Sequence, residues 1–285
     1  MDAESPSPRI DSLLAELLDE LLEDLAARAP LLVAFSGGVD SGVVAALARR
    51  AAGERSLAVT AAAETLAGRE LDQARRLASE IGIEHRIVTY SELDSAEFRA
   101  NPAHRCYVCQ GMRMATMQVV AREAGYRTVC DGTNASDVGP SRPGLAAVRE
   151  QGVYSPLLEH GVDKPTTRSI ALRLGLSAWN RPANACLSSR IPHGQMVTLG
   201  KLRRIEAAEE RLLSRGFEVV RVRSDGVGAR VEVGAGEVER LRGLWSELTA
   251  ELLALGFEHA ALDPRGYRTG GADLPQTEAV EPIGG

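Results

Sequence analysis

The first apolar pattern of the chain has the spacing of a helix. Leucine or isoleucine recurs every three or four positions from Ile10 to Leu25, and acidic side chains fill most of the positions between them. This periodicity predicts an amphipathic helix that packs against the protein or another subunit and ends before Pro30. Residues 1–9 contain Ser and Pro and little to bury, so they are predicted to form a disordered lead-in.

Short apolar runs then alternate with stretches of helical spacing. The runs predict strands at 31–35, of the buried kind, and at 57–62, and the alternation continues with strands near 84–88 and at 128–130. The intervening stretches predict helices after Ser41, at about 70–81 and at about 111–124. Alternating strands and helices are typical of an α/β fold, here a parallel, doubly wound sheet.

The order of elements changes from about Lys201. The pattern predicts a helix to Arg215, a strand at 217–223, a turn, a strand to Val233, a helix to Leu255 and a strand at 257–262. These elements indicate a smaller α+β domain. We therefore expect one domain at 10–195, a second at 196–270 for substrate binding and oligomerisation, and a disordered tail at 271–285.

Composition and charge narrow the class of protein. Of the 285 residues, 44% are hydrophobic and 25% are charged, which predicts a folded globular protein. No apolar run reaches the roughly 18–20 residues that span a membrane, and the acidic N-terminus does not resemble a signal peptide, so a cytoplasmic location is expected. A net charge of -6 disfavours long nucleic acid and favours a small-molecule substrate. Four cysteines are too few for a disulfide scaffold, which leaves them available for metal binding or chemistry.

The segment between the first predicted strand and its helix, Ser36-Gly37-Gly38-Val39-Asp40-Ser41, has the features of a phosphate site. Two glycines allow successive backbone N–H groups to converge on an anion, the serines add hydroxyl donors, and the helix directs its positive end to the same point. Asp40 would repel a phosphate, so it is expected to hold a bridging Mg²⁺ or to orient the loop.

This hexapeptide resembles the PP-loop of the ATP pyrophosphatases, which adenylate a substrate oxygen and release pyrophosphate. The resemblance implies an adenine nucleotide α-hydrolase-like fold that uses ATP and Mg²⁺. GMP synthetase, NAD synthetase, asparagine synthetase and tRNA-thiolating enzymes share the loop, so the loop indicates the chemistry and leaves the substrate open.

Six further segments resemble the LarE-type sulfur transferases. They are 105–109 (RCYVC), 131–137 (DGTNASD), 142–145 (RPGL), 184–194 (NACLSSRIPHG), 220–223 (VRVR) and 267–270 (YRTG). Enzymes of this type adenylate a pyridinium biscarboxylate mononucleotide and convert its carboxylates to thiocarboxylates, a step toward the nickel-pincer nucleotide of lactate racemase. The resemblance spans roughly residues 10–270 and implies this activity, this substrate class and a homo-oligomer, a hexamer in the family.

The cysteines allow several interpretations. A single CxxC, Cys106 and Cys109, can be a redox pair, half of a zinc site or part of an iron–sulfur site, and Cys130 ends a buried strand as a core thiol would. Cys186 lies in a polar loop where Arg190 could favour the thiolate, which suits a nucleophile. The resemblance implies two sulfur sources: Cys186 itself, which becomes dehydroalanine, or a sulfide on a [4Fe–4S] cluster held by Cys106, Cys109 and Cys186.

Basic residues provide candidate phosphate ligands. Arg221 and Arg223 lie two apart on a predicted strand, so both side chains leave the same face, where a substrate phosphate would relieve their repulsion; a solvated basic face is the alternative. Lys164 and Arg168 lie one helical turn apart and could meet nucleotide phosphates, or solvent.

Three further positions come from the resemblance. It places Glu209 and Glu232 near the substrate phosphate, although surface carboxylates are the simpler interpretation. It also places Gly132 at the nucleotide.

Three other functions remain open. A PP-loop tRNA thiolase would need an extended basic face, which the net acidity disfavours. An ammonia-dependent synthetase would not need Cys186. A nucleotide-sensing binding module would not release pyrophosphate steadily.

Overall fold

The computed structural model describes residues 8–138, 143–182, 185–224 and 226–268, which form two compact units. Unit 1 comprises the chain to residue 63 together with 68–90 and 106–184. Unit 2 comprises 64–67, 91–105 and the chain from residue 185 onward. The predicted lead-in, apart from residues 8 and 9, and the predicted tail lie outside the described residues, as do Arg142, Asn184, Thr269 and Gly270 of the motifs.

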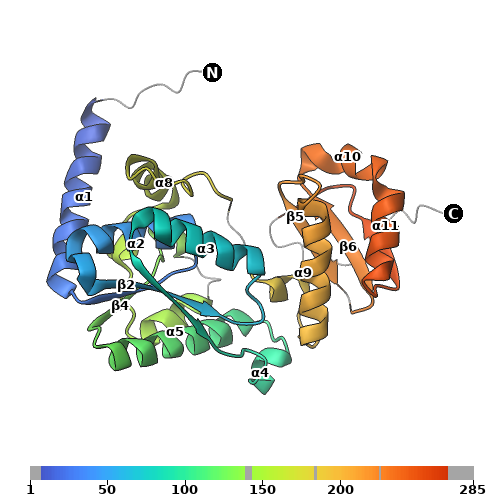
Figure 1. Cartoon of the computed structure of the whole chain (residues 1–285), viewed down its shortest axis with the longest axis horizontal. Coiled ribbons are helices and arrows are strands. Elements are labelled where there is room, and N and C mark those ends of the chain that lie inside the picture. The colour runs from blue at the N-terminus through green and yellow to red at the C-terminus, as the bar shows by residue number, and fades with distance from the viewer. Residues whose placement is uncertain (1–7, 139–142, 183–184, 225, 269–285) are drawn as a thin grey trace. The chain divides into compact units, whose positions relative to one another are not determined.

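Unit 1 is built on a four-stranded parallel sheet with the strand order β3-β2-β1-β4. Its strands are β1 (Leu31–Ala34), β2 (Ser56–Ala62), β3 (Glu84–Thr89) and β4 (Thr128–Cys130). Its longer helices are α1 (Pro8–Arg28), α2 (Val39–Ala52), α3 (Gly68–Ile81), α5 (Arg105–Ala124), α6 (Pro143–Glu150) and α8 (Lys164–Arg173), and α7 (Pro156–Glu159) is a single turn. Figure 1 shows the helices on both faces of the sheet. The predicted doubly wound parallel sheet is thereby confirmed.

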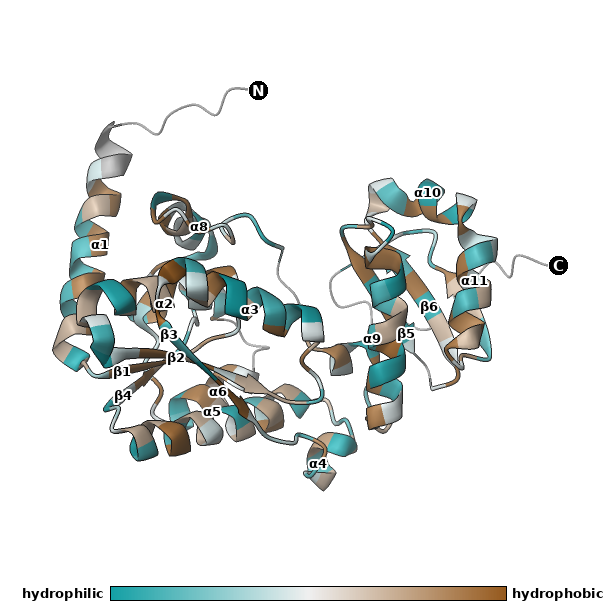
Figure 2. Ribbon diagram, viewed as in Figure 1, coloured by the Kyte–Doolittle hydropathy of each residue, from teal (hydrophilic) through white to brown (hydrophobic). Residues whose placement is uncertain are grey.

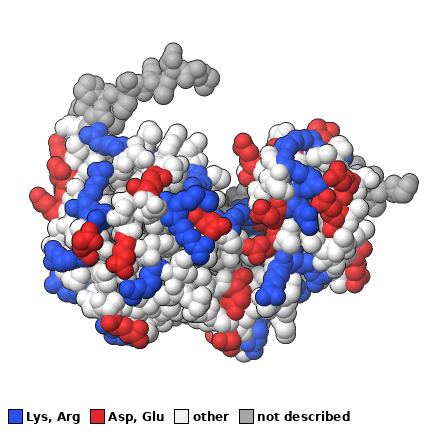
Figure 3. All heavy atoms as spheres, in the orientation of Figure 1, with Lys and Arg blue, Asp and Glu red and all other residues white. Residues whose placement is uncertain are grey.

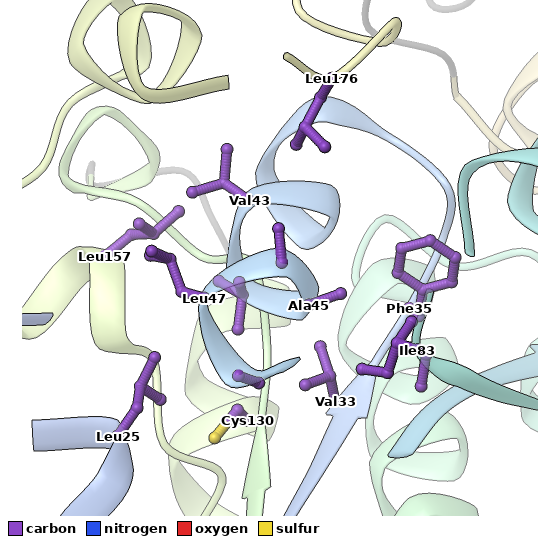
Figure 4. Packing of buried hydrophobic residues seen from close by; sticks show 14 of the residues in the cluster. Leu25, Val33, Phe35, Val43, Ala45, Leu47, Ile83, Cys130, Leu157 and Leu176 are labelled. Atoms are coloured by element: carbon purple, nitrogen blue, oxygen red, sulfur yellow. The ribbon is translucent and has the colours of Figure 1, made fainter. Parts of the chain in front are cut away.

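Two apolar cores hold the layers of unit 1 together. Residues of α1 and α2 pack against one face of the sheet, where Leu25, Val33 and Leu47 are fully buried (Figure 4). On the other face, Leu32 and Leu57 pack against Met117 of α5. Burial on both faces explains why β1 and most of β2 consist of apolar residues, whereas the edge strand β3 is partly exposed and contains Glu84, His85 and Arg86. Figure 2 shows the apolar residues along β1 and β4.

Unit 2 has a three-stranded mixed sheet. Strand β5 (Val220–Ser224) pairs antiparallel with β6 (Gly228–Val233), which pairs parallel with β7 (His259–Leu262). Helices α9 (Leu199–Leu213), α10 (Val238–Gly243) and α11 (Trp245–Ala254) cover an apolar core that includes Phe217, Val231 and Leu252. Helix α4 (Ala96–Arg99) belongs to the 91–105 segment. This arrangement confirms the smaller α+β domain.

Several boundaries differ from the sequence-based expectation. Helix α5 begins at Arg105, about six residues early, so the CxxC pair lies within its first five residues. Strands β5 and β7 begin three and two residues later than predicted. The last predicted helix is divided into α10 and α11 at Leu244. Unit 2 begins at residue 185, before the expected 196, and includes 64–67 and 91–105. Hydrogen bonds explain this last difference, since Leu187 N donates to Thr65 O and Val197 N donates to Arg99 O. Such long-range pairs leave no local pattern.

No helix among the described residues is long and apolar enough to cross a membrane.

Candidate active site

The PP-loop connects β1 to α2 and is folded around two serine hydroxyls. Ser36 Oγ and Ser41 Oγ lie 3.0 Å apart in a hydrogen bond, and Ser36 N donates to Ser41 Oγ at 3.2 Å. Gly38 N donates to Ser36 Oγ at 3.3 Å, and Gly38 is the N-cap of α2. The N–H groups of the first turn of a helix have no acceptor within the helix, so they face the point where an anion would bind.

Two glycines are required by close approach of the main chain. Gly37 has φ +74°, and a Cβ there would lie 2.6 Å from Ala74 Cα. A Cβ at Gly132, just after β4, would lie 2.6 Å from Ser41 N. Both positions therefore need glycine, and Gly132 is placed against the start of α2 as its predicted role at the nucleotide would demand.

Asp40 is bonded on both carboxylate oxygens. Lys164 Nζ lies 2.6 Å from Asp40 Oδ2, and Asn134 Nδ2 donates to Asp40 Oδ1 at 3.1 Å. The Asp40 and Lys164 side chains are 23% and 34% exposed, so ligands can still reach them. The structure thus brings together two predicted site residues and adds Asn134, which the sequence placed in a motif without a role.

Arg168 acts on the loop through a second arginine. Its Nη1 and Nη2 donate to the carbonyl oxygens of Trp179 and Arg181, at 2.8 and 2.9 Å. Arg181 Nη1 in turn donates to Gly37 O at 3.1 Å. Arg168 therefore reaches the PP-loop only through Arg181, and Arg181 contacts the PP-loop although no sequence motif indicated it.

Asp131 anchors the end of β4 beside Gly132. Its carboxylate accepts hydrogen bonds from Ser155 Oγ at 2.6 Å and from Thr133 N at 3.2 Å. Burial raises the pKa of Asp131, and the hydrogen bonds from Ser155 and Thr133 oppose that rise. This network fixes the main chain of the 131–137 motif against the start of α2.

The cysteines of unit 1 differ in access. Cys106 is exposed and Cys109 is buried in the first turn of α5, where Arg113 Nη2 donates to Cys109 Sγ at 3.6 Å. Cys130 is fully buried in the core shown in Figure 4, and burial raises the pKa of its thiol to about 12. Cys130 is therefore held as an unreactive core thiol, whereas Cys106 of the CxxC pair has the access that chemistry needs.

The loop that carries Cys186 belongs to unit 2 and is fixed through its main chain. Leu187 N donates to Thr65 O at 2.9 Å, Arg105 Nη1 donates to Ser188 O at 2.9 Å, and Arg223 Nη1 donates to Ser189 O at 3.0 Å. The Cys186 side chain is half-buried, and its Sγ lies 3.1 Å from Ser188 Oγ in a hydrogen bond. A rigid loop thus presents an accessible thiol.

Arg190 and Glu209 form a buried ion pair beneath this loop. Both side chains are fully buried, with Arg190 Nε and Nη2 at 2.8 and 3.0 Å from the two Glu209 oxygens. Arg190 Nη1 donates to Cys186 O at 3.0 Å, and Val222 N donates to Glu209 Oε1 at 3.1 Å. Glu209 is thus no surface carboxylate in this structure, and it connects the Cys186 loop to β5.

The two arginines of β5 have different surroundings. The Arg223 guanidinium lies 3.1 Å from Glu232, which also accepts from Arg230 at 3.2 Å. Arg221 is 6% exposed, donates to Val220 O at 2.7 Å and stacks over Tyr267, and no carboxylate among the described residues pairs with it. Burial lowers the pKa of Arg221, and the charge of Arg190 lowers it further. Both arginines are buried, so the alternative interpretation, a solvated basic face, does not hold.

The predicted metal ligands are divided between the two units. Cys106 and Cys109 belong to unit 1, and Cys186 belongs to unit 2. Within the described parts of the chain, no group of three or more His, Cys, Asp or Glu side chains is arranged to hold a metal ion.

Comparison with known proteins identifies the family. The asparagine synthase family profile matches residues 13–132, the region of the PP-loop and the sheet. An uncharacterised protein of Synechocystis is 39% identical over 84% of this chain and 90% of its own length. The pyridinium-3,5-bisthiocarboxylic acid mononucleotide synthase of Lactiplantibacillus plantarum is 34% identical over 87% of this chain and 90% of its own length. The chain belongs to this synthase family, the LarE family.

LarE membership confirms the resemblance drawn from the six motifs. A more distant relative is the tRNA-specific 2-thiouridylase MnmA of Rhizorhabdus wittichii, 30% identical over 65% of this chain but only 58% of its own length. The chain thus matches the LarE protein nearly throughout and the tRNA enzyme in part, which favours the LarE interpretation of the shared PP-loop.

Proposed function

We propose that this LarE-type chain is an ATP-dependent sulfur transferase. It adenylates the carboxylates of a pyridinium biscarboxylate mononucleotide and converts them to thiocarboxylates, which serve nickel-pincer nucleotide biosynthesis. The observation that carries the proposal is the match to the Lactiplantibacillus synthase, which spans both the PP-loop and the Cys186 loop. Each unit then supplies one half of the chemistry.

Unit 1 carries out the adenylation. A carboxylate oxygen of the substrate attacks the α-phosphorus of ATP, the α–β bridging bond breaks, and pyrophosphate leaves with the electron pair. The N–H groups at the start of α2 and the hydroxyls of Ser36 and Ser41 would receive the pyrophosphate. Asp40 fits a Mg²⁺ ligand because its carboxylate is partly exposed beside these donors, and Mg²⁺ would neutralise the phosphate charge there. Lys164, whose ammonium group bonds to Asp40 Oδ2, would contact the phosphates beside that metal ligand.

Unit 2 supplies the sulfur through Cys186. Its thiolate attacks the carbonyl carbon of the acyl adenylate, and AMP leaves with the electron pair of the broken C–O bond. A base then removes the Cα proton of Cys186, and the Cβ–S bond breaks with its electrons going to sulfur. The products are the thiocarboxylate and a dehydroalanine at residue 186, so this route uses each protein molecule once.

We further propose that Cys106, Cys109 and Cys186 hold a [4Fe–4S] cluster, which would supply exogenous sulfide and allow repeated turnover. The CxxC pair suits two ligands, since both thiols lie within the first five residues of α5 and, three residues apart, on the same side of the helix. Cys186, which belongs to unit 2, is the third ligand that the resemblance to LarE-type enzymes implies. Iron and sulfide analysis of anaerobically purified protein tests this point, together with Cys106→Ala, which should abolish both cluster and repeated turnover. Dehydroalanine at residue 186 in iron-free, sulfur-transferring protein would favour the sacrificial route.

The phosphate of the mononucleotide is assigned to β5. Arg221 is the better candidate for direct contact because its guanidinium forms no ion pair with a described carboxylate, although the charge of Glu209 lies near enough to act on its pKa. Paired arginines bind phosphate through charge-assisted hydrogen bonds. Arg223, Glu209 and Glu232 complete this site, with Glu232 neutralising Arg223 and Glu209 holding Arg190. Arg168 would act on the nucleotide site through Arg181. A cytoplasmic location and a homo-oligomer, a hexamer as in the family, belong to the same proposal.

Product analysis tests the function directly. The full-length protein is incubated anaerobically with Mg-ATP and pyridinium-3,5-biscarboxylic acid mononucleotide, and nucleotide products and the mass of the pyridinium product are measured. We expect AMP, pyrophosphate and thiocarboxylate in parallel. ADP as the main product would overturn the proposal.

The tRNA-thiolating alternative is tested in the same assay by replacing the mononucleotide with unmodified tRNA. The MnmA relatives support it only over the shared region, and Figure 3 shows acidic and basic side chains interspersed on the visible face of each unit. We expect no sulfur in tRNA.

A further inference from the structure

Asn101 has an unusual backbone and a fully bonded side chain. It is the one non-glycine residue with positive φ (+55°) in the described chain, and it is completely buried. Its Nδ2 donates to Pro192 O at 2.7 Å, to Gln195 O at 2.9 Å and to Ile191 O at 3.3 Å. Its own carbonyl oxygen accepts from Gly194 N at 2.8 Å. A strained conformation that persists in this way is over-determined by its surroundings and often lies at a functional site.

Arg105 continues this set of contacts toward Cys186. Its Nη1 donates to Asn101 Oδ1 and also, at 2.9 Å, to Ser188 O, and the side chain is buried. Ser188 is itself 1% exposed, and its hydroxyl bonds to Cys186 Sγ at 3.1 Å. Asn101 and Arg105, which we call the bracket, therefore hold the residues that follow Cys186 at Ser188 and at 191–195.

We propose that Asn101 and Arg105 are positioning residues for sulfur transfer, because they fix Ser188 and thereby the Cys186 thiol. The inference rests on the proposed function in that Cys186 is taken as the residue that meets the adenylate. A loop connection of this length would otherwise sample many conformations, and misplacement of a nucleophile by about 1 Å can cost about 100-fold in rate. The bracket removes that freedom through main-chain carbonyls, so it leaves the thiol itself accessible.

The bracket also explains two residues that no part of the adenylation uses. Neither Asn101 nor Arg105 contacts the PP-loop in any described hydrogen bond, and both belong to unit 2. Their hydrogen bonds instead go to the main chain of the Cys186 loop within unit 2.

The test separates adenylation from sulfur transfer. Arg105→Met removes both donated hydrogen bonds, Arg105→Lys restores one donor, and Asn101→Gly keeps the positive φ while removing the side chain. Arg99→Met is the matched control, since Arg99 lies in the same segment and its side chain donates to Leu93 O, away from Ser188. Each full-length variant is assayed for pyrophosphate released and for thiocarboxylate formed per pyrophosphate.

We expect Arg105→Met and Asn101→Gly to lower thiocarboxylate per pyrophosphate by about 10- to 100-fold, with pyrophosphate release and the KM for ATP unchanged. Arg105→Lys should recover part of this loss, and Arg99→Met should match the wild type. An unchanged ratio in both Arg105→Met and Asn101→Gly would overturn the proposal, as would equal loss of pyrophosphate release.

Alkylation by iodoacetamide, read at each cysteine by peptide mass spectrometry, keeps the outcomes distinct. Cys130 is fully buried in unit 1 and reports unfolding of that unit, whereas Cys186 reports its own loop in unit 2. We expect Cys186 to react faster in the bracket variants while Cys130 stays protected; unchanged Cys186 reactivity in both variants contradicts the bracket. If Cys130 becomes reactive in Arg105→Met, that variant is partly unfolded, and Asn101→Gly and Arg105→Lys then decide whether the bracket positions the Cys186 thiol. If the wild type releases no pyrophosphate, the proposed function fails, and the alkylation result still decides whether the bracket holds the loop.

Discussion

The two units build their candidate sites from different materials. In unit 1 the main chain forms the candidate site: Gly37 and Gly132 allow close approach, and the N–H groups at the start of α2 are those that we propose bind the phosphates. In unit 2 buried arginines form it, with Arg190 and Arg223 bonded to carbonyl oxygens of the Cys186 loop and to Glu209 and Glu232. The site in unit 1 depends on glycines that leave room for the main chain, whereas the site in unit 2 depends on buried charges that neutralise one another. Substitutions in the first site should therefore reduce activity, and substitutions in the second should reduce the free energy of unfolding.

The largest effect is expected from Glu209→Gln in unit 2. Arg190 would remain fully buried without its carboxylate partner, and breaking a buried ion pair in this way costs about 3–5 kcal/mol. The free energy of unfolding is measured by urea titration. Glu210→Gln, at the exposed neighbouring position, is the control and should change little. A loss below about 1 kcal/mol, as for a surface pair, would remove the contrast between the units.

Asp40→Ala should have the next largest effect, on chemistry alone. Loss of a metal ligand and of the partner of Lys164 should slow pyrophosphate release by about 100-fold, while the stability changes little because Asp40 is partly exposed. Asp72→Ala, an exposed carboxylate on α3, is the matched control. A near-wild-type rate would show that Asp40 only orients the loop.

This contrast also shows what could be predicted from sequence. The PP-loop was recognisable because its conformation demands glycine and serine at neighbouring positions, so the signal is local. The pattern along unit 1 likewise predicted its strands to within one residue, because β1 and β2 are mostly buried and consist largely of apolar residues, and strands and helices alternate along the chain.

The arginine contacts of unit 2 could not be predicted in the same way. Arg190 and Glu209 are 19 residues apart, and Asn101 and Pro192 are 91 apart, so no local pattern pairs them. Glu209 and Glu232 looked like surface carboxylates because a buried charge and an exposed one have the same sequence signal. Asparagine adopts a positive φ more readily than most residues, but the sequence does not say which asparagine does so, and the positive φ of Asn101 is seen only in the fold.

The third prediction concerns the two arginines of β5. Arg221→Ala should raise the KM for the mononucleotide about tenfold and leave the KM for ATP unchanged, because its guanidinium has no described carboxylate partner. Arg223→Ala should do the same and also lower the free energy of unfolding, since Glu232 would lose one of two arginine partners. Equal loss of affinity for both substrates would contradict the assignment to the mononucleotide.

The smallest effect is expected from the buried thiol of unit 1. Because burial raises the pKa of Cys130 to about 12, the unfolded chain loses this proton at lower pH than the folded chain. The contribution of the Cys130 thiol to the free energy of unfolding is therefore complete below the pKa of an unfolded thiol. It is lost as the pH rises toward 12, by about 1 kcal/mol at pH 10. The free energies of unfolding of the wild type and of Cys130→Ala are compared by urea titration from pH 8 to 10. The difference between these two free energies should become smaller as the pH rises. A constant difference would mean that the thiol is not desolvated.

The division of labour between the units is tested most directly by Cys186→Ser. The thiol is replaced by a hydroxyl of similar size, and the PP-loop of unit 1 is left untouched. Pyrophosphate, AMP and thiocarboxylate are quantified from the anaerobic full-length protein with Mg-ATP and pyridinium-3,5-biscarboxylic acid mononucleotide. The account predicts continued pyrophosphate release with no detectable thiocarboxylate. Thiocarboxylate at the wild-type level, or loss of pyrophosphate release in the folded variant, would contradict it.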